Sequence, residues 1–342
     1  MKKIAFFDAK PYDKTYFDPL SQEHGYQLKY FEHKLNEDTA RLTAGFDGVI
    51  AFVNDILDAE VIETLYQNNV PIAALRCAGY NNVDFKSAYG KVHIVRVPAY
   101  SPYAVAEHAM AMLLTLNRKT HRAYIRTRDF NFTLNRLTGF DLHGKNAGVI
   151  GTGKIGRVFI DICKGFGMNV IAYDPYPQEG IDYVSLEELC KRADVISLHC
   201  PLTDSTHHII NRDTLSQMKK GTYLINTSRG ALIDSEALLE ALKSGHLGGA
   251  GLDVYEEEGD FFYEDRSGKI MQDDVLALLV AQPNVLVTSH QAFLTNEALE
   301  NIAKTTVENL DAFFEDKPLE NEICYRCLKS QTCDKKHKNR CF

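Results

Sequence analysis

The sequence predicts an α/β protein made of two domains, each built around a parallel β-sheet. Short β-rich segments alternate with helical segments through most of the chain, and such alternation is typical of βαβ units. The length of 342 residues is large for a single hydrophobic core and favours about two domains. A glycine-rich turn follows a strand-like segment near the middle of the chain, where the second series of strands begins.

The first series contains five segments with the composition of strands. They lie at residues 3–7, 26–30, 48–52, 72–76 and 94–97. A helical pattern at residues 59–68 is one of those that separate them. A long apolar segment follows at residues 101–126, with Ser101 as a suitable N-cap and Pro102 in the first turn. Because this segment is apolar on several faces, we expect a single helix that bridges the domains and contributes to a subunit interface.

The second series begins near residue 145. Its expected strands lie at residues 146–150, 169–173, 194–199, 222–226, 249–253 and 284–288. A helical segment at residues 296–314 follows, and we expect it to return to the first domain, which makes that domain discontinuous. The expected parts of the chain are residues 1–100 with 297–322, residues 101–296, and a tail at 323–342.

Composition excludes several kinds of partner. The formal net charge is −8, whereas a nucleic-acid-binding protein needs a net basic face. No apolar run approaches the ~20 residues of a transmembrane helix, and the run at residues 4–7 is too short for a secretory signal. We therefore expect a cytoplasmic protein with a small-molecule partner, and neither nucleic acid nor a membrane.

The glycine-rich turn has the pattern GxGxxG at Gly151, Gly153 and Gly156, between the strand at residues 146–150 and a helix. In dinucleotide-binding proteins the first glycine permits a tight turn and the second lets the backbone approach a pyrophosphate. The third allows the helix to pack closely on the strand. The helix N-terminus offers N–H groups and the positive end of its dipole to the phosphates. The alternative is a glycine-rich turn without a ligand.

Asp174 follows the next strand, 18 residues after Gly156. A carboxylate at this point accepts hydrogen bonds from the ribose hydroxyls of NAD and repels the 2′-phosphate of NADP. The next residues, Pro175 and Tyr176, include no arginine that would receive such a phosphate. The pattern therefore favours NAD, and the alternative is a solvated aspartate in a turn.

Three residues near expected strand ends fit the reduction of a 2-keto acid by a nicotinamide. The reaction needs a cation for the substrate carboxylate, a general acid for the carbonyl oxygen, and a group that keeps the acid protonated. Arg229 suits the first role, because a guanidinium holds a carboxylate with two parallel hydrogen bonds. His290 suits the second and Glu258 the third, because a carboxylate beside an imidazole favours the protonated ring. From spacing alone, the alternatives are a structural histidine, a solvated arginine and a run of surface glutamates.

At these residues the chain resembles the D-isomer-specific 2-hydroxyacid dehydrogenase family, over about residues 1–322. The resemblance rests on the motifs RCAGYNNVD, VPAYSP-x-AVAEHA, GVIGTGKIG, DVISLHCPLT, NTSRGALID, GLDVYE-x-E and H-x-AF. It implies two Rossmann-like, doubly wound domains with the active site in the cleft between them. The substrate domain would be built from both chain ends and the NAD-binding domain from the middle. We also expect a homodimer or homotetramer.

The resemblance implies an activity and a role for each matching residue. The implied reaction reduces a small 2-keto acid to its D-2-hydroxy acid, with pyruvate to D-lactate as the leading case. Arg229 would bind the substrate carboxylate, His290 would be the general acid and base, and Glu258 would pair with His290. The substrate site would also include Ala78, Gly79 and Tyr100. Further cofactor contacts are implied at Lys154, Ile155, Cys200, Pro201, Thr206, Thr227, Ser228 and Asp253.

The substrate preference and the class of function leave alternatives. Tyr80, Tyr100 and Phe293 favour pyruvate if they line a small apolar pocket, whereas their ordinary role is core packing. One methylene changes binding in such a pocket by only ~1–3 kcal/mol, so glyoxylate, hydroxypyruvate and branched 2-keto acids are alternative substrates. An NAD-sensing, co-repressor-like binding protein is the alternative from another class.

The chain departs from the family after about residue 321. The tail reads EICYRCLKSQTCDKKHKNRCF and contains Cys324, Cys327, Cys333 and Cys341. Such thiols can close a tetrahedral zinc site or, as a second possibility, hold an iron–sulfur cluster. In a reducing cytosol they are not expected to form disulfides. The alternative is a tail of reduced thiols without a metal.

Overall fold

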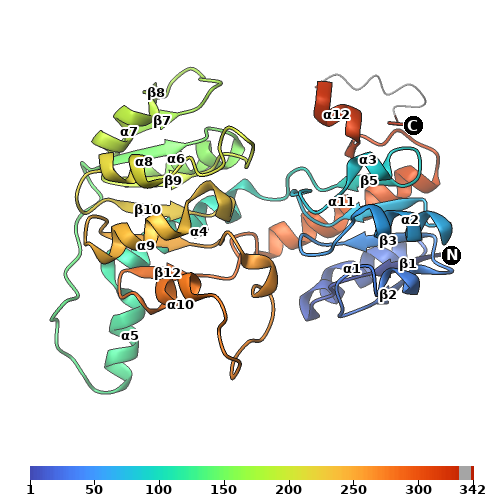
Figure 1. The fold of residues 1–342 in the computed structure, drawn as a ribbon, viewed down its shortest axis with the longest axis horizontal. Coiled ribbons are helices and arrows are strands. Elements are labelled where there is room, and N and C mark those ends of the chain that lie inside the picture. The colour runs from blue at the N-terminus through green and yellow to red at the C-terminus, as the bar shows by residue number, and fades with distance from the viewer. Residues whose placement is uncertain (331–339) are drawn as a thin grey trace. The chain divides into compact units, whose positions relative to one another are not determined.

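A computed structural model describes residues 1–330 and 340–342 of the chain. The chain forms two compact units (Figure 1). Unit 1 consists of Met1–Ser101 with Thr295–Phe342, and unit 2 consists of Pro102–Leu294. Each unit contains its own sheet, which confirms the predicted fold class of two α/β domains with parallel strands. The domain limits drawn from the sequence stay a prediction.

Unit 1 contains a six-stranded sheet in the order β13-β5-β4-β3-β1-β2. Its strands are β1 (Lys2–Phe6), β2 (Tyr26–Tyr30), β3 (Gly48–Ala51), β4 (Ile72–Leu75), β5 (His93–Arg96) and β13 (Glu322–Ile323). The first five pair in parallel, and β13 pairs antiparallel with β5. The last strand therefore attaches the C-terminal part of the chain to the edge of the N-terminal sheet.

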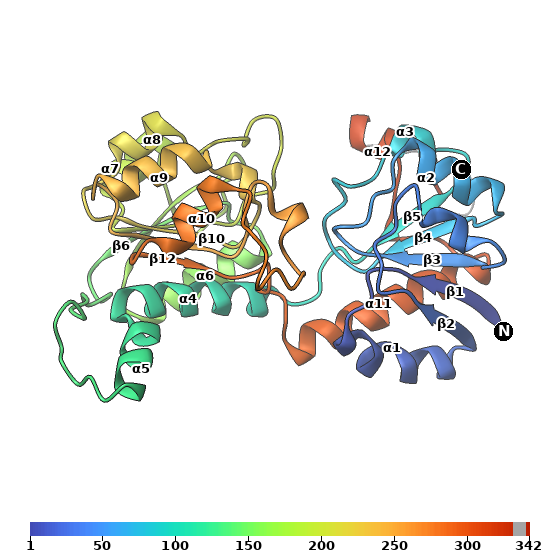
Figure 2. The ribbon, with the colours of Figure 1, turned by 60° about the horizontal axis from the view of Figure 1, so that its bottom comes forward.

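Helices cover both faces of this sheet. They are α1 (Pro11–Glu23), α2 (Ala59–Gln67), α3 (Phe85–Ala88), α11 (Asn296–Phe314) and α12 (Tyr325–Ser330), with a 3₁₀ turn η1 (Ala40–Thr43). Helices α1 and α11 lie on one face, and α2 and α3 lie on the other (Figure 2). Every residue of β3 and β4 is buried, because central parallel strands have helices on both sides.

Unit 2 contains a seven-stranded, fully parallel sheet in the order β12-β11-β10-β9-β6-β7-β8. Its strands are β6 (Asn146–Ile150), β7 (Asn169–Tyr173), β8 (Asp182–Tyr183), β9 (Val195–Leu198), β10 (Tyr223–Asn226), β11 (Gly249–Leu252) and β12 (Val285–Val287). The chain runs outward from β6 to β8 and then resumes on the other side of β6 with β9. In doubly wound sheets, ligands bind at the carboxyl ends of the strands where the order reverses in this way.

The helices of unit 2 are α4 to α10, with two 3₁₀ turns. They are α4 (Pro102–Arg118), α5 (Thr120–Arg128), α6 (Lys154–Gly165), α7 (Leu186–Arg192), α8 (Arg212–Gln217), η2 (Gly230–Leu232), α9 (Ser235–Lys243), η3 (Glu258–Asp260) and α10 (Asp274–Ala281). The expectation of one helix over residues 101–126 is wrong, because α4 and α5 are separate. Lys119 lies between them in the left-handed region, with φ 52°.

The break follows a change in composition. Helix α4 buries apolar side chains against α6 and the strands β10 and β11. Helix α5 is rich in basic residues and has no buried side chain. It therefore has no apolar face that would pack against the core if the helix continued in the direction of α4. The Lys119 ammonium donates to the Thr138 carbonyl at 2.7 Å and holds the loop that follows α5 close to the break.

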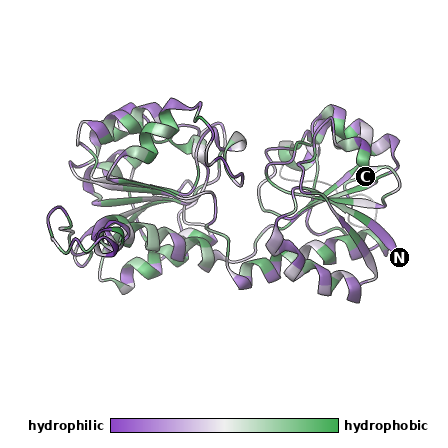
Figure 3. Ribbon diagram, turned by 90° about the horizontal axis from the view of Figure 1, so that it is seen from below, coloured by the Kyte–Doolittle hydropathy of each residue, from purple (hydrophilic) through white to green (hydrophobic). Residues whose placement is uncertain are grey.

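Hydropathy follows the same layering in each unit. The central strands are largely hydrophobic, whereas the helices carry both hydrophobic and hydrophilic residues (Figure 3). None of the described helices has the length and hydropathy that crossing a lipid bilayer requires.

Candidate active site

The predicted cofactor and catalytic residues of unit 2 lie in loops that follow parallel strands. Because the strands are parallel, these loops all leave the same edge of the sheet. The glycine turn follows β6, and Asp174 follows β7. Cys200 follows β9, Arg229 follows β10, and His290 follows β12.

The three glycines of the turn have different reasons to lack a side chain. Gly151 has φ 93°, and a Cβ there would lie 2.5 Å from the Cys200 nitrogen. A Cβ on Gly156 would lie 2.0 Å from the Gly151 carbonyl oxygen, so helix α6 packs on the turn only with glycine at this position. A Cβ on Gly153 would meet no atom within 4 Å. Packing within the protein thus does not explain Gly153, and the space beside it fits the approach of a pyrophosphate.

Helix α6 begins at this turn with its first N–H groups directed away from the helix. Its N-cap is Gly153, which makes no side-chain cap hydrogen bond. Lys154 is exposed and Ile155 is half-buried in the first turn. The backbone of this turn therefore suits the phosphates of a dinucleotide.

Asp174 is held against the glycine turn. Its Oδ2 accepts a hydrogen bond from the Thr152 N–H at 2.7 Å and another from the Thr152 hydroxyl at 3.0 Å. Its Oδ1 accepts from the Tyr176 N–H at 2.9 Å. The carboxylate is half-buried and fixed in orientation beside the turn. This position fits a carboxylate that receives the ribose hydroxyls of NAD.

The loops after β9 and β10 are tied together. The Ser228 hydroxyl donates to the Cys200 carbonyl at 2.6 Å, and the Thr206 hydroxyl donates to the Pro201 carbonyl at 2.7 Å. Burial raises the pKa of the Cys200 thiol to about 11, so the thiol is neutral near pH 7. The Thr227 hydroxyl oxygen is buried and has no hydrogen-bond partner among the described residues. Buried polar groups normally have a hydrogen-bond partner, and a polar cofactor bound at this edge of the sheet would supply the partner for this hydroxyl.

Arg229 lies where the loops after β10 and β11 meet. The Asn226 side chain donates to the Arg229 carbonyl at 2.8 Å and so fixes this turn. A Cβ on Gly230 would lie 2.0 Å from the carbonyl carbon of Tyr255, so only glycine allows this approach. The guanidinium donates to the Ser228 carbonyl at 2.6 Å. No carboxylate in the described part of the chain forms an ion pair with Arg229, which leaves its charge for an anionic ligand.

Glu258 and His290 form the predicted acid–base pair. The Glu258 Oε1 lies 2.7 Å from His290 Nδ1, and the two side chains are 17% and 16% exposed. The other carboxylate oxygen accepts from the Tyr255 N–H at 2.9 Å. With Nδ1 engaged in this way, His290 Nε2 has no hydrogen-bond partner among the described residues. Nε2 is therefore the nitrogen that can exchange a proton with a substrate.

Asp253 fixes the loop that carries His290. Its carboxylate accepts hydrogen bonds from the Thr288 hydroxyl at 2.6 Å and from the Gln291 and Ala292 N–H groups, both at 2.9 Å. The His290 N–H donates to the Asp253 carbonyl at 2.7 Å, and His290 adopts φ 52°. Burial raises the pKa of Asp253, but the hydrogen bonds outweigh this effect and hold the pKa below its usual value. The family resemblance implied a cofactor contact at Asp253. It did not predict that Asp253 also positions the loop that carries His290.

Two further residues of this region were also missed. His108 on α4 has its Nε2 3.4 Å from Asp253 Oδ1, and the AVAEHA motif contains it. The Tyr263 hydroxyl donates to the His290 carbonyl at 2.8 Å. No motif used in the sequence analysis contains Tyr263.

In unit 1 the predicted substrate residues follow β4 and β5. The N–H groups of Ala78 and Gly79 have no acceptor among the described residues, so they are available to an anion. Arg96 donates to the Ala78 carbonyl at 2.7 Å and fixes that loop. The Tyr100 carbonyl accepts from the Asn301 side chain at 2.8 Å.

Arg76, at the start of the RCAG motif, was not singled out and has a clear structural role. It is 2% exposed, and it donates to the Asp8 carbonyl at 2.7 Å. It also stacks on Phe52 with 3.9 Å between the guanidinium carbon and the ring centroid. Arg76 therefore ties the loop after β4 to the loop after β1.

Two of the aromatic residues considered for the pocket, Tyr80 and Phe293, are at least partly buried. Tyr80 packs edge-to-face on Phe85, and Phe293 is buried in unit 2. A role in substrate size selection stays a prediction.

The C-terminal cysteines are brought together in part. Cys324, Cys327 and Cys341 converge in unit 1, whereas Cys333 lies outside the described residues. This group contains none of the residues assigned to hydride transfer.

The fold and the loops of unit 2 define a dinucleotide-binding α/β dehydrogenase. A family model described as "D-isomer specific 2-hydroxyacid dehydrogenase, NAD binding domain" matches residues 110–292. The chain therefore belongs to the D-isomer-specific 2-hydroxyacid dehydrogenase family, an NAD-dependent family of oxidoreductases, as its motifs predict.

Individual relatives support the same assignment. The chain is 50% identical over 327 residues to the D-lactate dehydrogenase of Escherichia coli (strain K12), covering 94% of this chain and 99% of that protein. It is 46% identical over 330 residues to D-lactate dehydrogenase kk1H of Curvularia clavata, covering 94% and 95%. The apo-structure of the Escherichia coli D-lactate dehydrogenase matches with a TM-score of 0.86 and 49% identity, covering 94% of this chain and 99% of that one.

Proposed function

We propose that the protein is an NAD-dependent D-lactate dehydrogenase, which reduces pyruvate to D-lactate and also catalyses the reverse reaction. The observation that carries this proposal is the Glu258–His290 pair, with 2.7 Å between Oε1 and Nδ1, at the same sheet edge as the unpaired guanidinium of Arg229. The names of the relatives that are 50% and 46% identical support lactate as the hydroxy acid.

The roles of the side chains follow from their chemistry. When bound, NADH supplies the hydride that C2 of the keto acid accepts. Negative charge then develops on the carbonyl oxygen, and His290 donates the proton from Nε2 to that oxygen. Glu258 holds the ring by Nδ1, so that the exchangeable proton stays on Nε2, and its charge stabilises the protonated ring. Arg229 binds the substrate carboxylate with two parallel hydrogen bonds and thereby orients the carbonyl.

We extend the proposal to the remaining predicted contacts. The open backbone at Gly153, the carboxylate of Asp174 and the orphaned hydroxyl of Thr227 support the binding of NAD in unit 2. In unit 1, the free N–H groups of Ala78 and Gly79 support a role in binding the substrate carboxylate. Asp174 supports NAD over NADP, because its negative charge would face the 2′-phosphate.

The test is NADH oxidation by the purified protein with a set of 2-keto acids, followed by chiral analysis of the product. We expect pyruvate to give the highest kcat/KM and the product to be D-lactate. Glyoxylate, hydroxypyruvate or a branched 2-keto acid as the best substrate would contradict the lactate assignment while leaving the family unchanged. NAD binding without turnover of any 2-keto acid would favour a sensing protein.

We also propose that the protein forms a homodimer or homotetramer. After α5, the side chains of Phe130, Phe132 and Leu134 are 83%, 69% and 81% exposed, which is unusual for a surface that meets only water. Sedimentation measurements should show an oligomer that Phe130→Ser with Phe132→Ser weakens, and a monomeric wild type would contradict it. None of the described cysteines forms a disulfide, which supports a location in the reducing cytoplasm.

A further inference from the structure

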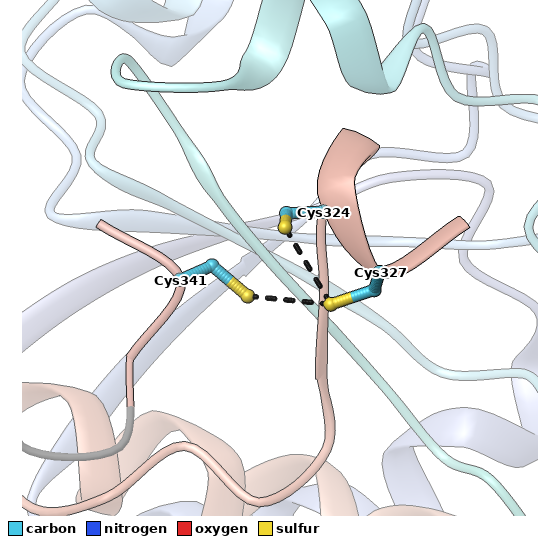
Figure 4. A group of neighbouring side chains, drawn as sticks. All are labelled: Cys324, Cys327 and Cys341. Carbon is cyan, nitrogen blue, oxygen red and sulfur yellow. Dashed lines mark hydrogen bonds between the residues drawn. The ribbon is translucent and has the colours of Figure 1, made fainter. Parts of the chain in front are cut away.

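We infer that Cys324, Cys327 and Cys341 bind one zinc ion, which fixes the C-terminal end of the chain to the sheet of unit 1. The three sulfur atoms face one another in Figure 4, and they all lie within 4.8 Å of one another. The inference goes beyond the proposed reaction, because none of these residues belongs to the dehydrogenase site. The matched family segment, residues 110–292, does not contain them either.

The distances between the sulfur atoms match those of thiolates that share one ion. The Sγ atoms of Cys324 and Cys327 are 3.5 Å apart, and those of Cys327 and Cys341 are 3.7 Å apart. Two thiolates in a tetrahedral zinc site lie about 3.8 Å apart, given a Zn–S bond of about 2.3 Å. Disulfide sulfurs are about 2.05 Å apart, so the arrangement is not that of a disulfide.

The local sequence explains why the first two thiols converge. Cys324 immediately follows β13, and Cys327 lies in the first turn of α12, so a spacing of three residues places both on one side of the turn. The backbone N–H groups of Arg326 and Cys327 are directed at the Cys324 sulfur. Such N–H groups stabilise a thiolate that is bound to a cation.

The third thiol comes from the other end of the tail and is held in place by its neighbours. The Cys341 N–H donates to Glu322 Oε2 at 2.6 Å, and Glu322 Oε1 lies 2.6 Å from His93 Nδ1. The Phe342 ring stacks on His93 with 4.1 Å between the centroids. The Arg340 guanidinium donates to the Ala312 and Phe313 carbonyls at 3.1 and 3.0 Å, at the C-terminal end of α11. Cys341 is therefore positioned beside the other two thiols by contacts that involve no sulfur.

Zinc is the ion that this donor set favours. Thiolates are soft ligands, and sites made of several cysteines on short segments typically hold zinc in a structural role. The three thiolates leave one tetrahedral position for water or a further side chain. An iron–sulfur cluster distributes its thiolates over two or more iron ions, so three cluster thiolates would lie farther apart than the three sulfurs do here. Cys324 and Cys341 are 3% and 6% exposed, and a bound ion would stabilise these buried sulfurs as thiolates.

The test is elemental analysis of the full-length protein, purified anaerobically without chelator and without a histidine tag. We expect about one zinc ion per chain, no iron, and loss of the zinc in Cys324→Ala, Cys327→Ala and Cys341→Ala. The matched control is Cys163→Ala, a buried cysteine of unit 2, which should keep the zinc. Cobalt added in place of zinc should show thiolate-to-metal charge-transfer absorption in the wild type and in the control only. Because metal content is measured without substrate, the result is independent of whether the protein reduces pyruvate.

A second measurement uses only the wild-type protein, so it tests the inference even if the alanine variants fail to fold. In the wild type, the three thiols should resist alkylation, and a zinc chelator should make them react, as mapped by peptide mass spectrometry. Wild-type protein that binds neither zinc nor cobalt would overturn the inference. The same holds for Cys341→Ala with full zinc content, for iron with labile sulfide in place of zinc, and for a Cys324–Cys327 disulfide in freshly isolated protein.

Discussion

Replacing Glu258 by glutamine should separate the two roles that this carboxylate has toward His290. One glutamate oxygen lies 2.7 Å from His290 Nδ1, and the other accepts the Tyr255 N–H at 2.9 Å. A glutamine that keeps its oxygen on Tyr255 presents its NH₂ group to Nδ1. The neutral ring then carries its proton on Nε2, so it cannot accept a proton from lactate there. The change should therefore impair lactate oxidation throughout the pH range, by about 100-fold or more.

The loss of charge should also change the pH profile of pyruvate reduction. Two unit charges about 4 Å apart interact with roughly 4 kcal/mol at an effective dielectric constant near 20. The side chains of Glu258 and His290 are 17% and 16% exposed, and solvent screening reduces this interaction. We expect the lost interaction to lower kcat/KM for pyruvate reduction by about 10- to 100-fold, or roughly 1.4–2.7 kcal/mol. The carboxylate favours the protonated ring, which is the form that donates the proton to the substrate. Without this carboxylate, the decline of pyruvate reduction with rising pH should begin at a lower pH than in the wild type.

The assay is kcat/KM for pyruvate reduction and for lactate oxidation as a function of pH, with NADH binding measured by fluorescence. Glu256→Gln is the matched control, because Glu256 lies in the same loop and has its Oε1 2.6 Å from His208 Nε2. We expect the control to retain the wild-type profile. Superimposable profiles of Glu258→Gln and wild type would refute the assigned role of Glu258.

Four other substitutions test the remaining assignments. His290→Gln should lower pyruvate reduction by at least ~100-fold with little change in NADH affinity, and near-normal turnover by the folded variant would exclude it as the acid. Arg229→Lys keeps the charge but loses the two-pronged geometry, so kcat/KM for pyruvate should still fall severely; unchanged kinetics would argue against bidentate binding. Asp174→Ala should relax the preference for NADH over NADPH, and an unaltered ratio would place the selecting group elsewhere. Asp253→Asn places an NH₂ group against a backbone N–H and should cost about 1–3 kcal/mol in the free energy of unfolding at pH 7. Because the pKa of Asp253 is lowered in the folded protein, this difference should shrink as the pH falls below about 4, and a constant difference would contradict that account.

Much of the fold and of the site was readable from local sequence. The predicted strands in the first 100 residues coincide with β1 to β5 to within a few residues, because most of them contain a short apolar run between polar turns. The glycine turn and Asp174 could be predicted for a similar reason, since the GxGxxG pattern and the carboxylate after the next strand lie within one short βαβ segment of the sequence. The break at Lys119 was not readable, because no glycine or proline marks it and the end of buried contacts decides it.

The sequence alone was enough to name the chemical groups and to place each one after a strand, since residue type and strand pattern are local properties. It could not show which groups meet. Glu258 and His290 are 32 positions apart, and they pair only because β11 and β12 are neighbours in the sheet. The thiol of Cys341 reaches Cys327 because Glu322 and His93, on paired strands, hold the chain end. Such contacts depend on strand order and on packing between distant segments, and those are set by the whole folded chain.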